Sequence, residues 1–437
     1  TLDLNNHTLA YTGTADRFLT VNKAGSVLTV TDNSTAKGGK LDVTKSYDGN
    51  LRCVSVSSGE FVVEGGQVSV QNTMAGKTAR AIWPVTNAIV TIKGGTVQAK
   101  SPKDARAINT GNICTINVSG GNIIAKAQDT NDAWGANAYS IYFEKGTLTM
   151  SGNPVITSEA ASSAYGVYAS GDGPGFHISG GTINATTKSG NSALCVRIGG
   201  TTGDGMAIGV IEGGTFNAKS QGTYPCAAVV EINGNLTIEG GTFDVQSLTN
   251  GGDVDCTRCG YGGTLEINGG SFTAHYNDTK AGRSVGVRGG TVTVNGGTFS
   301  GTEGMTAINY ASAYATNTAN VTINGGSFVT SGTTLNVSSR KREAKLDQGK
   351  ETERDTTYTC NANVTVNGGY FCSTGSTIVN LAQADGAAAS TLVLNGGKYA
   401  EKSGSTYKGQ ITAFKGFTTS VTDINETVDG KTYKYEL

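Results

Sequence analysis

Apolar and polar residues alternate along most of the chain in short runs that are interrupted by Gly-Gly. In "VTINGGSFVT" (321–330), Val321 and Ile323 fall on one side of an extended chain and Thr322 falls on the other, and a second run follows the glycines. Alternation with a period of two predicts β-strands that bury one face. Each copy of the phrase therefore predicts two strands joined at a Gly-Gly corner.

The phrase recurs along the chain with a regular period. Its first glycine stands at positions 65, 94, 120, 180, 213, 240, 269, 296, 325, 368 and 396, and a degenerate copy, "MSGNPVIT", puts Gly152 in the widest gap. Most of these positions are 26 to 33 residues apart. A period of this length is typical of a solenoid in which each repeat is one supersecondary unit.

A third strand-like piece precedes each pair. It reads "ARAIW" (79–83), "ARAIN" (105–109), "AYSIY" (138–142) and "AYGVY" (164–168). Three short strands in each turn predict an all-β fold, a single right-handed parallel β-helix solenoid of about twelve coils. Turns stacked about 4.8 Å apart would share continuous ladders of parallel strands.

The Gly-Gly pair is expected at the corner between the second and third strands. One glycine can take a positive φ, and neither carries a Cβ that would collide with the neighbouring turn. Asn, Ser or Glu before the pair can bond the turn backbone, and stacked Asn side chains can form ladders. The motif is therefore interpreted as structural. Valine at Gly325, taken as the positive-φ residue, is expected to cost more stability than valine at Thr322.

The start of the chain, "TLDLNNHTLAYTG" (1–13) followed by "LTVTD" (28–32), and the tandem "INGGTF"-type turns resemble the right-handed parallel β-helix repeat regions of secreted and cell-surface proteins of Gram-positive gut bacteria. The resemblance covers nearly the whole chain and implies a secreted or cell-surface, extracellular location. The wider, pectate-lyase-like fold is also similar to polygalacturonases and phage tailspikes. Because this fold carries many functions, activity must be argued from a site.

Three regions are expected along the chain. Residues 1–60 predict N-terminal capping coils, residues 61–400 hold the repeats, and residues 401–437 predict a C-terminal coil that ends in the edge strand "KTYKYEL". The charged segment 340–355 widens one period and predicts a protruding loop or a short exposed helix. Unpaired strand edges at both ends favour end-to-end assembly into a filament, with flanking domains that cover the ends as the alternative.

Composition excludes several classes of protein. Of 437 residues, 64 are Gly and 5 are Pro, and 33 Lys and Arg residues nearly balance 34 Asp and Glu residues, for a net charge of −1. This balance gives no field that would attract nucleic acid or an anionic membrane. The chain also lacks a run of 18 apolar residues that would predict a membrane span. No cofactor is expected, and the expected partners are a surface glycan, a host protein or further copies of the chain.

The eight cysteines favour an oxidising compartment. Cys226 and Cys256 are 30 residues apart and are assigned to one column of adjacent turns, which would place them within disulfide range. Cys360 and Cys372 flank the turn with the charged insertion and are expected to pair as well. The spacing of "CTRC" (256–259) also suits a metal or redox site, but the chain has no second pair of this kind. No partner is assigned to Cys53, Cys114, Cys195 or Cys259.

No catalytic constellation of the pectin-cleaving proteins occurs in the sequence. The combination of Asn-Thr-Asp, Asp-Asp, His-Gly and Arg-Ile-Lys is absent, and the three histidines are isolated. Asp253 and Asp255 lie in a Gly-rich stretch, where a calcium site is the alternative to a solvated turn. The chain is therefore expected to be a non-enzymatic structural or adhesive protein. A polysaccharide-degrading β-helix enzyme or a tailspike-like glycan depolymerase is the alternative.

The first strands of successive turns align into columns. The fourth column, with Ile82 and Ile108, is apolar and predicts a core ladder. The third and fifth columns are expected to face outward, so that small residues such as Ala81 lie beside aromatic rings. Such a surface suits the stacking of sugars or the anchoring of a partner, with packing under a covering loop as the alternative. The expected binding residues are Arg80, Trp83, Arg106, Tyr139, Tyr142, Tyr165 and Tyr168.

Overall fold

The described part of the chain consists of β-strands and their connections. The structure, a computed structural model, describes residues 1–437 except 129–134, 171–172, 174, 189–191, 200–206, 222–225, 233, 248–253, 261, 276–281, 309–317, 344–356, 375–377, 383–385, 404–405, 409–423, 429–430 and 436–437. Parallel strands form a β-solenoid of about eleven turns. The expected all-β, right-handed parallel β-helix is thus confirmed, and the expected count of about twelve coils is close. Among the described residues no helix could cross a membrane.

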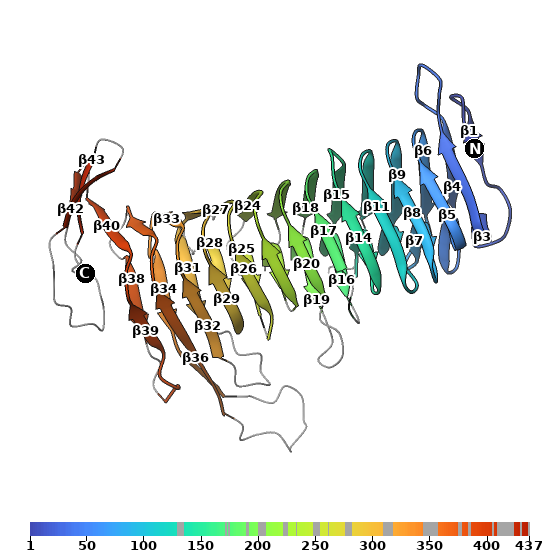
Figure 1. Ribbon diagram of the computed structural model, residues 1–437. Coiled ribbons are helices and arrows are strands. Elements are labelled where there is room, and N and C mark those ends of the chain that lie inside the picture. The colour runs from blue at the N-terminus through green and yellow to red at the C-terminus, as the bar shows by residue number, and fades with distance from the viewer. Residues whose placement is uncertain are drawn as a thin grey trace. The chain divides into compact units, whose positions relative to one another are not determined.

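The chain divides into two compact units. The first comprises Thr1–Asn235 and Val245–Asp253, and the second comprises Leu236–Asp244 and Val254–Leu437. Within each unit, a turn contains three strand positions, and the strands of successive turns lie side by side (Figure 1). The expected boundaries near residues 60 and 400 concern where the repeat becomes atypical, and they stay predictions.

In the first unit, two long strands, β3 (Arg17–Thr31) and β5 (Asn50–Val63), run through the first and second positions of their turns. The other first strands are β7 (Thr78–Pro84), β10 (Asp104–Asn109), β13 (Asn137–Phe143), β16 (Ser163–Ser170), β19 (Ser192–Gly199) and β22 (Cys226–Ile232). The second strands are β1 (Leu2–Asp3), β8 (Ala88–Ile92), β11 (Cys114–Val118), β14 (Gly146–Met150), β17 (Gly175–Ile178) and β20 (Ile208–Ile211). The third strands are β2 (Thr8–Ala10), β4 (Lys40–Lys45), β6 (Gln67–Asn72), β9 (Thr96–Ser101), β12 (Asn122–Ala127), β15 (Val155–Ala160), β18 (Thr182–Thr187) and β21 (Thr215–Ser220).

The second unit repeats this order, and the strands β23 (Asn235–Ile238) and β24 (Thr242–Ser247) contain residues of both units. Its first strands are β25 (Val254–Cys259), β28 (Gly282–Val287), β31 (Glu303–Ile308), β34 (Leu335–Ser338) and β38 (Val379–Ala382). Its second strands are β26 (Thr264–Ile267), β29 (Gly290–Val294), β32 (Thr318–Ile323), β36 (Thr357–Val366) and β39 (Thr391–Leu394). Its third strands are β27 (Ser271–His275), β30 (Thr298–Gly301), β33 (Ser327–Thr330), β37 (Tyr370–Ser373) and β40 (Lys398–Ser403).

Three antiparallel pairs in the second unit depart from the solenoid pattern. The strand β35 (Arg340–Glu343) pairs with the start of β36, so the charged segment begins as one arm of a hairpin rather than as a helix. The strand β41 (Thr406–Lys408) folds back on β40. The strand β43 (Lys431–Tyr435), which lies in the segment expected to end in an edge strand, pairs with β42 (Ile424–Val428) in a two-stranded sheet. The rest of the charged segment, residues 344–355, lies outside the described residues.

The Gly-Gly corner lies where it was expected, and each glycine has its own reason. The second glycine takes the positive φ, which is 100° at Gly326. The first has no room for a side chain, because a Cβ at Gly94 would lie 2.5 Å from the carbonyl oxygen of Glu64 in the preceding turn. A Cβ at Gly325 would likewise collide with the carbonyl oxygen of Asn295. The assignment of the positive φ to Gly325 is therefore wrong, although a side chain is still excluded there.

Two ladders of like residues stabilise the corners of the second unit. In the exposed ladder, each Asn Nδ2 donates to the Oδ1 of the Asn in the preceding turn over 2.7 to 2.9 Å. In the buried ladder, aromatic rings stack with centroids 4.3 to 5.1 Å apart. The stacking expected for Asn is thus confirmed in this unit. The asparagine ladder contains Asn268, Asn295, Asn324, Asn367 and Asn395, and the aromatic ladder contains Phe243, Phe272, Phe299, Phe328, Phe371 and Tyr399.

Candidate functional site

The first strands of the first unit are bent, and the bend brings residues three positions apart to the outer surface. In β7, Arg80 and Trp83 are partly exposed, whereas Ala81 and Ile82 between them are fully buried. The register between β7 and β10 skips the position of Ala81 and resumes at Ile82. The same partners continue in register on both sides of this position, so the two strands bend together and no residue is inserted in either of them. The expectation that the third column faces outward is therefore wrong, because this column belongs to the core.

Outward residues of consecutive first strands form one continuous surface feature, which we term the arginine–aromatic strip. All seven residues expected to bind a partner belong to it, although Tyr165 is buried against Leu194. Arg52, which is also buried, and Arg197 extend the strip. The register sets Arg52 beside Arg80 and Arg80 beside Arg106. Their assembly on one surface is observed, and their role in binding stays a prediction. The strip contains Arg52, Arg80, Trp83, Arg106, Tyr139, Tyr142, Tyr165, Tyr168 and Arg197.

The four tyrosines of the strip pack as a herringbone. The rings of Tyr139 and Tyr165 stack at 4.8 Å with an interplanar angle of 11°, and those of Tyr142 and Tyr168 stack at 5.1 Å and 15°. Rings of the same strand are nearly perpendicular, at 84° for Tyr139 and Tyr142. The ring faces therefore cover one another. The surface offers ring edges and hydroxyl groups, in place of the open ring faces expected for sugar stacking.

Arginines lie against the rings at both ends of this block. The guanidinium carbon of Arg106 lies 5.1 Å from the ring centroid of Tyr139 and 4.7 Å from that of Tyr142. At the other end, Arg197 lies 5.1 Å from the ring centroid of Tyr168. These are cation–π distances. The tyrosines are thus held between two cations, which limits the freedom of both residue types.

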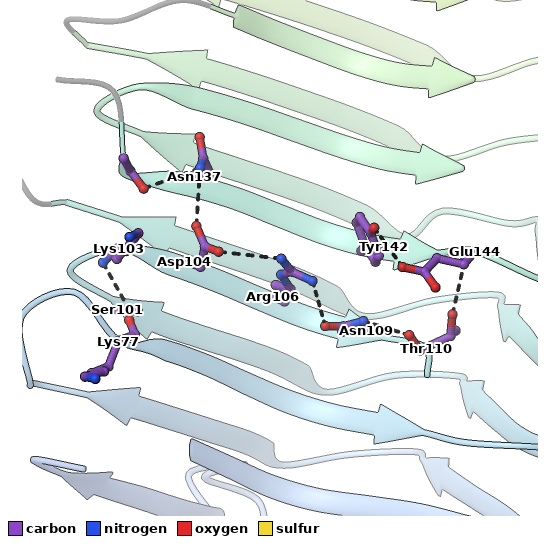
Figure 2. A network of polar contacts seen from close by, with 11 residues as sticks. Lys77, Ser101, Lys103, Asp104, Arg106, Asn109, Thr110, Asn137, Tyr142 and Glu144 are labelled. Atoms are coloured by element: carbon purple, nitrogen blue, oxygen red, sulfur yellow. Dashed lines mark hydrogen bonds and ion pairs between the residues drawn. The ribbon is translucent and has the colours of Figure 1, made fainter. Parts of the chain in front are cut away.

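Arg106 is fixed in place by polar contacts (Figure 2). Its Nη1 donates to Oδ1 of Asn109 over 3.0 Å, and its Nη2 lies 3.5 Å from Oδ2 of Asp104. Asp104 also accepts a hydrogen bond of 3.3 Å from Nδ2 of Asn137 in the next turn. The charge of Arg106 is therefore paired with a carboxylate and its position is set from two sides.

The phenol groups of the strip are weak acids. Burial raises the pKa of Tyr142 to about 12, and the hydrogen bond of 2.9 Å that its hydroxyl donates to Glu144 adds to this shift. Burial and the neighbouring Tyr165 raise the pKa of Tyr139. Both phenols are therefore protonated at neutral pH, and they suit hydrogen bonding to a ligand better than general-base chemistry.

Arg52, Arg80 and Arg106 lie side by side in the second column of the first strands. Arg80 is the one of the three that no described carboxylate contacts. Nη1 of Arg52 lies 2.5 Å from Oδ2 of Asp16, and Arg106 contacts Asp104. Within the described residues, Arg80 forms neither an ion pair nor a hydrogen bond, and its Nε is buried without an acceptor. The ring of Trp83 lies beside its guanidinium at 5.9 Å.

The sequence of β7 explains why this guanidinium has no acceptor. In β10, Asp104 precedes Arg106 by two positions and Asn109 follows it by three, and both side chains accept its hydrogen bonds. The residues at the matching distances in β7 are Thr78 and Trp83. Neither brings a carboxylate or an amide oxygen to the column.

Burial and the neighbouring charges act together on Arg80. Burial is the larger cause and lowers the pKa of Arg80, and the guanidinium groups of Arg106 and Arg52 lower it further. An arginine remains protonated at neutral pH even with such a shift. The middle of the column therefore carries a positive charge that no described carboxylate neutralises by contact.

Several contributors to the strip were not among the expected binding residues. Asp104, Asn109 and Glu144 hold the arginine and the tyrosines in place, and Asp16 neutralises Arg52. The alternation in "DARAIN" does place Asp104 on the same face as the arginine two positions later, so this contact had a signal in the sequence. Asp16 had none, because it lies outside the repeat.

A second candidate place is a hollow of about 610 Å³ at the Gly-Gly corners of the first unit, lined in part by Asp32 and Glu64. Hydrogen bonds from Ser34 and from the backbone N–H of Gly39 (2.7 Å) outweigh the effect of burial and lower the pKa of Asp32 to about 2. Lys93 contacts Glu64 at 3.0 Å. Both carboxylates are therefore already engaged in holding the corner and an ion pair.

The cysteines occupy core positions of the repeat. Cys53 and Cys195 are fully buried third-column residues, and Cys256 takes the same bent position in β25. The register with Ser192 places Cys226 three positions before the bend of β22. The assignment of Cys226 and Cys256 to one column is therefore wrong. The side chain of Cys226 lies outside the described residues, so the disulfide itself stays a prediction.

The remaining thiols are also buried. Cys360 and Cys372 are not joined by a disulfide, and none links the other cysteines whose side chains the structure describes. The expected pairing of these two residues is therefore not found. Burial raises the pKa of Cys259 to about 12, which keeps the thiol of the "CTRC" segment protonated. In the part of the chain that the structure describes, no three His, Cys, Asp or Glu side chains gather as metal ligands.

Asp255 was expected in a calcium site or a solvated turn, and this expectation is wrong. The residue lies in β25 with its side chain fully buried, and its carboxylate oxygens contact Arg258 at 2.8 Å, Arg283 at 3.2 Å and Arg288 at 3.3 Å. Burial alone would raise its pKa, but the three positive charges outweigh burial and lower the pKa to about 2. Protein cations thus occupy the carboxylate. Asp253 lies outside the described residues.

Comparison with known proteins adds no function to this picture. No protein-family model, no curated protein and no solved structure gives a significant match to the chain. The resemblance noted in the sequence therefore holds at the level of the fold, a parallel β-solenoid. The function is argued from the arginine–aromatic strip itself.

Proposed function

We propose that the protein is a non-enzymatic structural or adhesive β-helix, secreted or displayed on a cell surface, that holds a linear polymer along the arginine–aromatic strip. The observation that carries this proposal is the register of the strip. Arginine and aromatic side chains of consecutive turns project from equivalent positions of stacked strands. A linear ligand would meet similar groups at every turn, so many modest contacts could add up along its length.

The strip is rigid before any ligand arrives. Stacked rings and cation–π contacts hold the tyrosines, and Asp104 and Asn109 hold Arg106. Binding therefore costs little side-chain entropy, which favours affinity. Phenol hydroxyls and guanidinium N–H groups are hydrogen-bond donors, so the strip suits a ligand rich in oxygen acceptors.

The state of the carboxylates supports binding without cleavage. Hydrolysis of a glycosidic bond uses one carboxylic acid that gives a proton and a second carboxylate that attacks or activates water. In the strip, Asp104 is engaged by Arg106 and Asn137, and Glu144 accepts the hydrogen bond of Tyr142. Both carboxylates therefore support neighbouring side chains of the strip.

A panel of linear neutral and acidic polysaccharides tests the proposal. The purified protein is expected to retain at least one polymer without shortening it, as measured by affinity electrophoresis and by the length of the recovered polymer. The double variant Tyr142→Phe/Tyr168→Phe, which keeps the rings and removes two hydroxyls, should bind more weakly. Lys100→Gln in β9, on the third strand of its turn, is the matched control and should bind normally. Shortened chains whose formation is lost in Asp104→Asn would instead establish the glycan-degrading alternative.

End-to-end assembly is a separate prediction. The strand β43 pairs with β42 along one edge, so strand addition at this end of the chain would use the edge of β43 that faces away from β42. Light scattering over a wide range of protein concentration measures the outcome directly. A mass that stays at that of one chain would rule out the filament and leave polymer binding unaffected.

A further inference from the structure

We infer that the asparagine ladder of the second unit is a site of spontaneous deamidation, which starts at Asn395 and advances turn by turn towards Asn268. This inference goes beyond the proposed function, because it concerns the corners of the second unit and not the arginine–aromatic strip. It is carried by the sequence of these corners, by the hydrogen bonds of the ladder and by the contacts that Asn395 lacks.

Every asparagine of the ladder is followed by a glycine, and within the described residues Asn-Gly occurs nowhere else. In deamidation, the backbone nitrogen of the following residue loses its proton and forms a bond to the side-chain Cγ of asparagine. The bond from Cγ to Nδ2 breaks, ammonia leaves, and water opens the resulting cyclic imide to aspartate or isoaspartate. Glycine hinders this attack least, because it has no Cβ. The ladder therefore carries the dipeptide that suits the reaction best.

The folded corners hold the two reacting groups apart. Each asparagine donates from its side chain to the preceding turn, as at Asn324, whose Nδ2 lies 2.8 Å from Oδ1 of Asn295. Nitrogen and Cγ meet only when a corner opens, so the rate of deamidation follows the free energy of local opening. Four of the five glycine nitrogens also donate to a carbonyl oxygen of the preceding turn over 3.3 to 3.4 Å, namely those of Gly296, Gly325, Gly368 and Gly396.

Asn395 is held by fewer hydrogen bonds than the other asparagines of the ladder. From Asn268 to Asn367, each side chain donates to the preceding turn and accepts from the asparagine of the next turn. The side chain of Asn395 donates to Oδ1 of Asn367 over 2.9 Å, and no described residue donates to its own Oδ1. Opening the corner of Asn395 therefore breaks one hydrogen bond fewer, and this corner should react first.

Deamidation of Asn395 changes the contacts of the next asparagine in the ladder. The product carboxylate cannot donate, so Oδ1 of Asn367 loses its hydrogen bond. Asn367 then keeps only its own donation to Asn324, which is the state from which Asn395 reacted. Isoaspartate also lengthens the backbone at a corner without spare room, because a Cβ on Gly396 would lie 2.6 Å from the carbonyl oxygen of Asn367. Each event thus destabilises the corner before it, and the modification advances towards Asn268.

Peptide mapping by mass spectrometry tests the inference on the full chain, incubated at mildly alkaline pH to favour the deprotonated nitrogen. Asn395 is expected to lose its amide roughly two- to tenfold faster than Asn324, the difference that one exposed hydrogen bond makes. Asn367 should follow after a lag during which Asn395 reacts. Asn395→Ala ends the ladder at Asn367 from the outset, and the lag should disappear. Val393→Thr, at an exposed position two residues earlier, is the matched control and should keep the lag.

The outcomes separate the ladder from the dipeptide itself. In concentrated urea the five asparagines should react at similar rates, because each stands in the same apolar-Asn-Gly-Gly phrase. Similar rates in the folded protein as well would show that the ladder sets no order, and the inference would be wrong. It would also be wrong if Asn268 reacted first, or if Asn367 kept its lag in Asn395→Ala.

Discussion

The same positions of the repeat carry charge in both units, but they are used differently. In the second unit, Asp255, Arg258, Arg283 and Glu303 occupy the second and fifth columns, and each of these two guanidinium groups contacts a carboxylate. In the first unit, Arg80 sits in the second column and contacts no described carboxylate. The position of a charged residue in the repeat therefore does not by itself decide whether the residue forms an ion pair. The difference lies in whether the charges of the protein satisfy one another.

The asparagine ladder shows why an arginine column differs from other ladders. An Asn side chain both donates and accepts, so Asn324 can donate to Asn295 and accept from Asn367 at once. An Arg side chain only donates. Stacked asparagines can therefore satisfy one another's hydrogen bonds, whereas stacked arginines need acceptors from other residues or from a ligand. The asparagine ladder stabilises the fold, and the arginine column is the candidate for binding a ligand.

The largest effect is expected at the buried carboxylate of the second unit. Replacing Asp255 by Asn leaves Arg258, Arg283 and Arg288 without the charge that they surround, which should lower the free energy of unfolding by about 3–5 kcal/mol. Denaturant unfolding followed by circular dichroism measures the change. Glu303→Gln is the control at the partly exposed edge of the same network, and its effect should be smaller. Equal effects of the two variants would contradict the central place of Asp255.

The same residue predicts a dependence of stability on pH. The pKa of Asp255 is about 2 in the folded protein, below its usual value near 4 in an unfolded chain. Its contribution, about 2–3 kcal/mol, is therefore present above about pH 4 and is lost as the pH falls from 4 towards 2. Unfolding curves of the native protein and of Asp255→Asn at a series of pH values should converge over this window. A constant difference between them down to pH 2 would show that the carboxylate is not stabilised in the fold.

An intermediate effect is expected at the glycine corner. Gly325→Val places a branched side chain against the carbonyl oxygen of Asn295 and should lower the free energy of unfolding by about 1–3 kcal/mol. Thr322→Val, on the strand before this corner, should stay within about 0.5 kcal/mol of the native protein. Thermal unfolding of both variants provides the comparison. Equal melting temperatures would contradict the close approach of successive turns at the corner.

A smaller loss is expected from a single rung of the asparagine ladder. Asn324→Ala removes one hydrogen bond to each neighbouring turn at an exposed position, and the expected cost is about 0.5–1.5 kcal/mol. Amide hydrogen exchange should show local loosening at the corners of Asn295 and Asn367 and leave the buried strands protected. Protection lost throughout the second unit would mean that the ladder supports far more than its own corner.

The sequence predicts the local features of this fold well. The Gly-Gly corners and the alternation of the strands depend on short-range patterns that recur in most turns, and the aromatic residues of the strip fall at fixed positions within that pattern. The bend in the first strands was missed, because Ala81 and Ile82 read as one outward and one inward residue under strict alternation. Their two adjacent apolar side chains are the signal that could have revealed it.

The cysteine pairs and the charge network could not be predicted in the same way. Assigning residues of different turns to one column requires the register between the strands, which turns of unequal length hide. The sequence placed Cys226 and Cys256 in one column, whereas Cys226 lies three positions before the bend at which Cys256 lies. The environment of Asp255 depends on three arginines brought in from two strands and a turn, and its Gly-rich neighbours suggested a loop instead. Contacts of this kind between turns become visible only when the register is known.

The central claim is that Arg80 serves a ligand and does not hold the fold. Thermal unfolding of the native protein and of Arg80→Gln, each with and without a polymer of the polysaccharide panel that the native protein retains, tests it most directly, because a ligand that binds the folded state raises the melting temperature. The account predicts that the two proteins melt at the same temperature without polymer and that the polymer raises the melting temperature of the native protein alone. A variant that melts well below the native protein without polymer, or that gains as much from the polymer, would contradict it.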